Sequence, residues 1–342
     1  MNISKPRQEW ADVAKGLSML AVIAGHLGSS TINRLVYLWH LPVFFLISGY
    51  FLKIRPNTQF IKNKVQSLLI PYYLTCAAIC VTGAVSSLLT GKDVLETVRH
   101  WMWATLYAAG DSWTWPINIE AIGAIWFLWA LFFGMLIVHH LAEKKYGVPA
   151  IIAIAVTGWV SFEKSRVWLP LSIQSGMLCS LYILIGYLVK RKDVPGRFKT
   201  AGKPVWVLLI LCSMIITGIG VKQFKGFWLV HDYMGNGWLD FGISLCAAAL
   251  VVSVAILIST KTGFLKRLLM FYGVNSLWIL CLHIIDLDVL HVEKIMMYCI
   301  SSIGGEGLMQ NMVFMTVAIY GIKVVYVSLG VLLLKRLVAS ER

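Results

Sequence analysis

Stretches of about 20 apolar residues recur along the whole chain, and a helix of that length crosses a hydrocarbon core of about 30 Å. Hydrophobic residues make up 58% of the 342 residues, charged residues 13%, and the mean hydropathy is +0.76. A soluble domain carries about 25% charged residues. The composition therefore predicts a polytopic membrane protein. It excludes a secreted disulfide scaffold, a disordered regulator and a DNA-binding domain.

Apolar runs bounded by charged residues predict ten transmembrane helices, and hence an all-α helical bundle. We expect a single membrane domain over residues 1–342, with no separate soluble domain. The first apolar run is expected to remain as a helix, because residues 1–10 are too polar for a signal-peptide core. The predicted spans are 13–31, 36–53, 66–89, 121–141, 147–162, 172–189, 204–221, 240–259, 269–290 and 311–334.

The basic residues predict the orientation of the chain. Lys and Arg number 30 against 16 Asp and Glu, and most of them lie in every second loop, as in residues 190–203. The positive-inside rule then predicts both termini in the cytoplasm and a multi-pass protein of the inner cell membrane, with lipids as partners. Because the bases form no single patch, we expect no nucleic acid partner.

The first span carries the main candidate for chemistry. Lys15 and His26 are eleven residues apart, which returns a helix to within about 20° of the same face and about 16 Å further along its axis. Asp12 lies one turn before Lys15 and can pair with it. His26 is either a buried packing ring or a proton-transfer group, and ionisable groups inside membranes are usually functional. A neutral imidazole is suited to accept a hydroxyl proton.

Several motifs follow in order along the chain. The most specific is residues 40–50, His-Leu-Pro-Val-Phe-Phe-Leu-Ile-Ser-Gly-Tyr. Together they resemble membrane acyltransferase family 3, especially its branch similar to fucose 4-O-acetylases, although many family members have arginine where this chain has Lys15. The other motifs are Asp12-x-Ala-Lys-Gly with Gly25-His26, residues 60–64 with 68–72, Trp126-Phe127-Leu128, and residues 272–276 with Leu282-His283.

The resemblance implies transfer of an acyl group, usually acetyl, from cytoplasmic acyl-coenzyme A to a carbohydrate hydroxyl. It suggests His26 as general base and the Asp12–Lys15 pair as shaping the coenzyme channel. The bases expected to hold the coenzyme phosphates are Lys53, Arg55, Lys62 and Lys64. The residues expected to bind substrate are His40, Ser48, Trp126, Asn275, Ser276 and His283.

Other readings of these polar residues stay open. Ser48, Asn275 and Ser276 either face the reacting groups or form hydrogen bonds between helices. His40 and His283 either bind the acceptor or are interfacial rings that snorkel toward the membrane surface. We expect no metal, since no His-x-x-x-His or His-Glu spacing is present, and the odd number of cysteines, 7, suggests core residues.

Further groups have two interpretations each. Lys323, in the tenth span, pairs with a buried acid or approaches the cofactor. His139 and His140 are expected at a solvated helix end. Residues 90–120 and 222–239 are expected as outer loops, whose aromatic rings either bind sugars or form an interfacial belt.

Function also has alternatives. A secondary transporter or a flippase for a sugar-containing substrate needs many helices and buried charges too, as does a non-catalytic subunit of a polysaccharide assembly machine. Within the acyltransferase reading, the donor is acetyl- or succinyl-coenzyme A. The acceptor is an exopolysaccharide, a lipid-linked glycan, peptidoglycan or a small glycoside, and the assembly machinery is a candidate partner.

Overall fold

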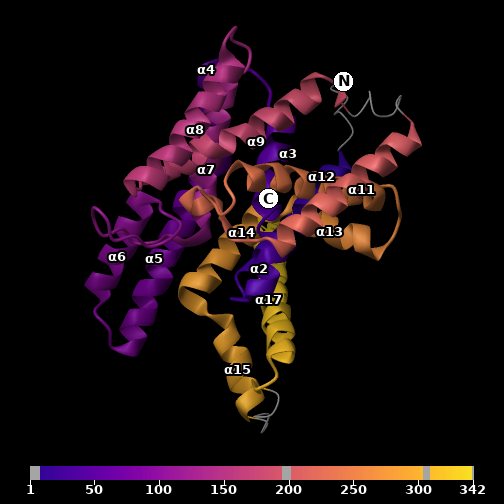
Figure 1. Ribbon diagram of the computed structural model, residues 1–342. Coiled ribbons are helices and arrows are strands. Elements are labelled where there is room, and N and C mark those ends of the chain that lie inside the picture. Colours follow the sequence, from indigo (N-terminus) through magenta and orange to yellow (C-terminus); the bar gives the residue numbers. More distant parts are fainter. Residues whose placement is uncertain (1–7, 195–201, 303–308, 341–342) are drawn as a thin grey trace.

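The computed structural model describes residues 8–194, 202–302 and 309–340, and it is built almost entirely from helices (Figure 1). The described strands are two short ones, β1 (Phe227–Trp228) and β2 (Tyr233–Met234), which pair antiparallel as a hairpin. The predicted fold class, an all-α polytopic membrane protein, is confirmed.

Eight helical stretches within the described residues are long and apolar enough to cross a membrane. A ninth consists of α13 (Phe264–Val274) and α14 with its extension (Ser276–Leu290), bent by 70°. The first helix, α1 (Glu9–Gly25), has 17 residues. The eight stretches are Ser30–Tyr50, Asn57–Thr90, Gly123–Leu141, Gly147–Ser165, Pro170–Arg191, Pro204–Lys222, Trp238–Ser259 and Met312–Leu337.

The predicted bounds of the first two spans, 13–31 and 36–53, are wrong. α1 ends at Gly25, and Gly28 follows with a φ of +73°, a conformation that glycine adopts readily. The second stretch begins earlier, as α2 (Ser30–Val36), and is interrupted before α3 (His40–Tyr50). The interruption matters because it places His40 at the start of a helix, beside the end of α1.

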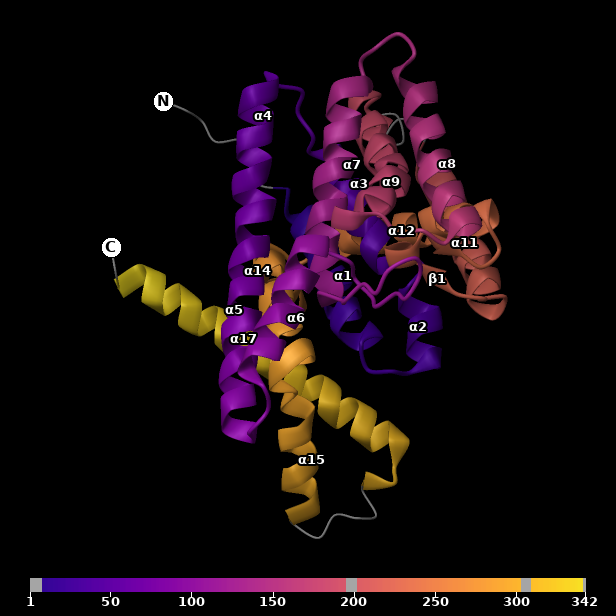
Figure 2. The ribbon, with the colours of Figure 1, turned by 90° about the vertical axis from the view of Figure 1, so that its left-hand side faces the viewer.

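The third stretch is longer than the predicted span 66–89. It joins α4 (Asn57–Lys64), a π-helical turn (Val65–Leu69) and α5 (Ile70–Thr90). Pro71 has no N–H to donate to the preceding turn, and the wider π turn directly before it accommodates the missing hydrogen bond. Figure 2 shows α4 extending from α5 toward the end of the molecule at the top of the view.

The two predicted outer loops contain regular structure. Residues 90–120 include α6 (Val94–Tyr107), which packs along α5 and whose first turn is capped by the Asp93 carboxylate. Residues 222–239 contain β1, β2 and a 3-10 turn between them, Leu229–His231. Contacts between aromatic side chains and the helix cap order these segments. Composition alone does not reveal this regular structure.

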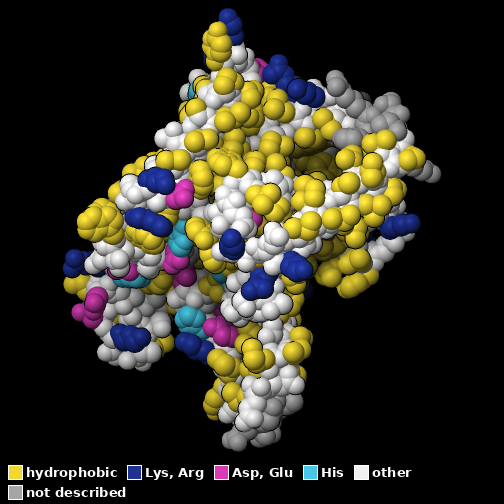
Figure 3. Space-filling model, in the orientation of Figure 1, with side chains coloured by type: hydrophobic (Ala, Val, Ile, Leu, Met, Phe, Trp, Pro, Cys, Tyr) yellow, Lys and Arg dark blue, Asp and Glu magenta, His cyan; other side chains and the backbone are white. Residues whose placement is uncertain are grey.

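α9 packs against α3, α7 and α8, and the remaining helices lie around this group. The stretch containing α9 is 72% buried within the protein, whereas that of α11 is 6% buried, so α9 is central and α11 faces the lipid. Hydrophobic side chains dominate the upper part of the face in Figure 3. The bounds are η2 (Gly123–Trp126), α7 (Phe127–Leu141), α8 (Gly147–Ser165), α9 (Ile173–Arg191), α11 (Lys203–Lys222), α12 (Trp238–Ser259), η5 (Asp286–Leu290), α15 (Val292–Ser302) and α17 (Met312–Ser340).

Glycines bring two helix pairs into backbone contact. A Cβ on Gly16 of α1 would lie 2.0 Å from the Leu269 oxygen, and one on Gly273 of α13 would lie 1.7 Å from the Asp12 oxygen. Small residues drive close packing of membrane helices, because the backbones can approach. α3 and α9 contact in the same way at Gly49 and Gly186. These contacts fix α1 and α3, the two helices that carry the candidate histidines.

Candidate active site

A cavity of about 260 Å³ lies where α1, α3, α7 and α14 meet the β1–β2 hairpin, called the outer hairpin because its loop is predicted to lie outside. Most of its lining is apolar, for example Met19, Phe44 and Leu131. Polar groups are few, so a charge that develops inside is poorly screened by water. Six residues selected from the sequence line the cavity: Lys15, His26, His40, Ser48, Trp126 and Ser276.

His26 terminates α1, and its tautomer is set by the backbone. The ring Nδ1 lies 2.8 Å from the Val22 carbonyl oxygen. Because a carbonyl oxygen can only accept, Nδ1 carries the proton of the neutral ring and Nε2 carries a lone pair. Nε2 has no hydrogen-bond partner within the described ranges, and the ring borders the cavity. His26 is therefore arranged as a proton acceptor.

His40 repeats this geometry at the start of α3. Its Nδ1 lies 2.8 Å from the Val36 carbonyl oxygen, so its Nε2 also carries a lone pair. Tyr37, which no sequence pattern singles out, packs on the His40 ring and donates from its hydroxyl to the Gly25 carbonyl at 3.0 Å. Tyr37 thus ties the break between α2 and α3 to the end of α1.

Two of the expected substrate residues do not line the cavity. His283 is fully buried behind His26, with ring centroids 5.3 Å apart and ring planes at 69°. Neither ring nitrogen of His283 has a partner among the residues that are described. Asn275 is buried at the bend between α13 and α14, where its amide donates to the Phe271 carbonyl at 2.6 Å. Both residues support the cavity from behind.

The expected pair of charges on α1 is present. Lys15 Nζ lies 2.8 Å from the Asp12 carboxylate, and the carboxylate side chain is only 6% exposed. Lys15 lines the cavity with His26, as the helical spacing predicts. A partly exposed cation beside a buried carboxylate gives this part of the cavity a polar wall.

A second hollow, of about 360 Å³, lies at the connection between α3 and α4. Three expected bases, Lys53, Arg55 and Lys64, line it, together with Asn63. Lys62 lies outside it, because it occupies a different face of α4 from Lys64. Three cations around one hollow form an anion-binding environment.

His139 packs behind this basic hollow, and the expectation of a solvated histidine at that position is wrong. The ring is only 4% exposed and stacks on Phe60 with centroids 3.7 Å apart. Its Nε2 contacts the backbone of Arg55. His139 therefore fixes the connection that carries two of the bases.

The outer hairpin provides the remaining wall of the main cavity, through residues 227–230. Its turn is anchored by His231, whose Nε2 lies 3.2 Å from the Asp111 carboxylate and whose ring contacts Trp168 and Trp113. The His231 ring beside Asp111 lowers the pKa of that carboxyl below its ordinary value. Ser175 of α9 also donates to the Val230 carbonyl.

Comparison with known proteins agrees with this arrangement. The family described as "Acyltransferase domain" matches residues 8–333. Nodulation protein NolL of Mesorhizobium japonicum (strain LMG 29417 / CECT 9101 / MAFF 303099) is 25% identical over 268 residues, which is 70% of this chain and 65% of that relative's length. No solved structure matches the chain.

The family match extends over α1, α3 and the α13–α14 bend, the elements that form the cavity, and it confirms the resemblance seen in the motifs. The matched region also contains the described helices that are long and apolar enough to cross a membrane. The chain therefore belongs to this acyltransferase family.

Proposed function

We propose that the protein transfers an acyl group, most simply acetyl, from cytoplasmic acyl-coenzyme A to a hydroxyl of a carbohydrate or glycolipid. The observation that carries the proposal is the Nε2 lone pair of His26 at the wall of an apolar cavity. A general base needs an unprotonated nitrogen within reach of the substrate hydroxyl. The hydrogen bond from His26 Nδ1 to the Val22 carbonyl leaves Nε2 as the unprotonated nitrogen.

The reaction follows from this assignment. His26 Nε2 removes the hydroxyl proton as the hydroxyl oxygen forms a bond to the thioester carbonyl carbon. The bond between that carbon and sulfur then breaks, and the leaving thiolate takes the proton back from His26. Ser48 and Ser276 line the same cavity and have hydroxyls able to donate to the carbonyl oxygen as it gains charge.

Two chain segments connect the basic hollow to the cavity and support a route for the donor. Ser48 lines the cavity, and residues 51–53 line the hollow a few positions later on the same segment. Lys64 lines the hollow, and Leu68 lines the cavity one turn further along the helix. We assign the coenzyme phosphates to the basic hollow and its acyl arm to the passage toward His26.

On the other side of the cavity, the outer hairpin supports an acceptor arriving from outside. Trp228 is 40% exposed and also lines the cavity, so it borders both the outer surface and the site. Aromatic rings of this kind pack well against sugar rings. A carbohydrate hydroxyl is therefore the acceptor that we propose.

The test is transfer of labelled acetyl from acetyl-coenzyme A to the total glycan and glycolipid pool of membranes. Membranes with the parent protein are compared with His26→Ala and His26→Gln at equal protein level. We expect both variants to lose at least about 100-fold of the transfer rate, as removal of a general base does.

Label in His26→Ala membranes equal to that of the parent, above a control without the protein, contradicts the role of His26. Absence of label with the parent protein redirects the search to succinyl-coenzyme A, to transport or to a non-catalytic role. Where label is transferred, the acceptor pool is fractionated next, because the labelled fraction identifies the acceptor class.

A further inference from the structure

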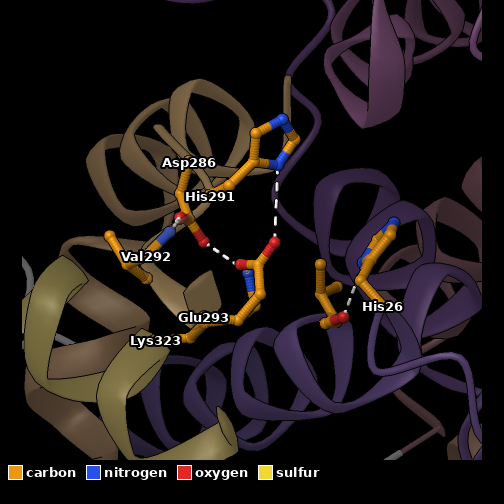
Figure 4. A network of polar contacts seen from close by, with 7 residues as sticks. His26, Asp286, His291, Val292, Glu293 and Lys323 are labelled. Atoms are coloured by element: carbon orange, nitrogen blue, oxygen red, sulfur yellow. Dashed lines mark hydrogen bonds and ion pairs between the residues drawn. The ribbon is translucent and has the colours of Figure 1, made fainter. Parts of the chain in front are cut away.

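Lys323 of α17 is a buried cation between two carboxylates. Its Nζ lies 2.6 Å from Asp286 Oδ2 and 2.7 Å from Glu293 Oε2, and its side chain is 3% exposed (Figure 4). Burial opposes ionisation of Glu293, but the hydrogen bond and charge of Lys323, together with a backbone hydrogen bond and the nearby His291, lower the pKa of that carboxyl. The sequence expectation that Lys323 pairs with a buried acid is confirmed.

The partner Asp286 also shapes the backbone. Its Oδ1 accepts the N–H of Val292 at 2.7 Å, and its carbonyl accepts the N–H of His291 at 2.8 Å. Between them, His291 has a φ of +51°, which breaks the helix between the π turn η5 and α15. A single carboxylate thus stabilises this break and pairs with α17.

This network lies directly behind the candidate base. His283 precedes Asp286 by three residues, on the same helical segment, and its ring meets the His26 ring edge-on. The Lys323 charge is close enough to act electrostatically on both histidines. Figure 4 shows His26 and the network on neighbouring elements, with the Lys323 side chain reaching toward Asp286 and Glu293.

A buried cluster of charges contributes little to stability, because the cost of removing charges from water often exceeds their mutual attraction. Ionisable residues inside membranes more often serve function. Here the charges join three elements, α17, η5 and α15, to the segment that carries His283. A displacement of this network would therefore be transmitted along the helix to His283.

We propose that Lys323 and Asp286 are positioning residues for acyl transfer: they hold His283 against His26 and so keep His26 Nε2 directed into the cavity. The proposal rests on the function proposed for His26. Neither residue lines the cavity, so both act through the two histidines and not on the substrate. Their loss is expected to slow the chemical step and leave donor binding unchanged.

The test measures kcat and KM for acetyl-coenzyme A in purified Asp286→Asn, Lys323→Met and Lys323→Arg. Asp286→Asn keeps the oxygen that accepts the Val292 N–H and removes the charge. We expect kcat to fall 10- to 100-fold in Asp286→Asn and Lys323→Met, as small displacements of catalytic groups do. KM is expected to stay within about two-fold, and Lys323→Arg, which keeps the charge, should recover most of kcat.

The matched control is Lys294→Met, which removes an exposed lysine next to Glu293 on α15 and is expected to keep the parent kcat. Size-exclusion profiles and Tm report folding, and if Lys323→Met does not fold, Asp286→Asn decides. A parent-like kcat in Asp286→Asn, or an equal loss in Lys294→Met, overturns the proposal. An inactive parent, or an active His26→Ala, instead contradicts the proposed function.

Discussion

The His283 ring meets the His26 ring edge-on at 5.3 Å, although 257 residues of sequence separate them and only His26 borders the cavity. Edge-to-face contacts of this kind have a preferred geometry and orient the rings that make them. Because neither nitrogen of His283 has a partner within the described part of the chain, the ring acts here through its shape.

For this reason, His283→Phe is expected to retain more activity than His283→Ala. Phenylalanine preserves an aromatic edge against His26, whereas alanine leaves a cavity that costs about 2 to 5 kcal/mol of stability. Acetyl transfer and Tm of both variants, measured at one protein concentration, check this. A His283→Phe variant as inactive as His283→Ala indicates that a ring nitrogen is required.

His40 presents a second Nε2 to the cavity, and we expect it to serve the acceptor. His40→Gln is expected to raise KM for the acceptor about 10-fold, the effect of losing one hydrogen bond to a buried polar group. KM for acetyl-coenzyme A should not change. Initial rates over a matrix of both substrate concentrations separate the two constants, and a rise in donor KM alone contradicts the assignment.

The basic hollow predicts which lysine matters for donor binding. Lys64→Gln removes a cation from the hollow and is expected to raise KM for acetyl-coenzyme A about 5- to 10-fold, with a weaker dependence on salt. Lys62→Gln, two residues away and outside the hollow, is expected to change KM for acetyl-coenzyme A less than Lys64→Gln does. Equal effects of the two variants argue against the hollow as the phosphate site.

Where a glycine lies in contact with a neighbouring backbone, replacing it with a larger residue is expected to lower stability. Gly16→Ala places a Cβ 2.0 Å from the Leu269 oxygen, so the helices must move apart, at a cost of about 1 to 3 kcal/mol. Gly242→Ala in α12 is the control, because nothing lies within 4 Å of its Cβ. Thermal unfolding in detergent should show a lower Tm for Gly16→Ala and a parent-like or higher Tm for Gly242→Ala.

The Asp111–His231 pair predicts a pH-dependent contribution of the outer hairpin. Because the folded-state pKa of Asp111 is lowered, its stabilising effect is present above the unfolded value of about 3.9. The effect disappears as pH falls through the folded-state pKa. Asp111→Asn should therefore lower Tm slightly at neutral pH and not at acidic pH; a difference that is constant with pH contradicts this.

Much of the fold follows from sequence, and so does one face of the site. Helical spacing places Lys15 and His26 on one stripe, and both line the cavity. The contact of His283 with His26 depends on the 70° bend after Val274, which no local pattern encodes. Likewise, Gly16 and Gly273 are unremarkable in sequence, and their role appears only when the two backbones meet.

The basic residues illustrate the same limit. Lys62 and Lys64 look equivalent as parts of one cluster, but the helical phase of α4 directs only Lys64 into the hollow. The ends of α1 and the break before His40 were also misplaced, because apolar runs continue through Gly28 and residues 37–39. Hydropathy measures affinity for lipid, and it does not record where hydrogen bonding ends a helix.

The anchored outer hairpin bears on hydrolysis of the acyl donor. A thioester held beside an activated base is open to attack by water, which would consume the donor without product. In the proposed mechanism, residues 227–230 and the apolar side chains around them would limit the access of water to that position. Loosening the hairpin at Asp111 or Ser175 would then turn the protein toward a thioesterase.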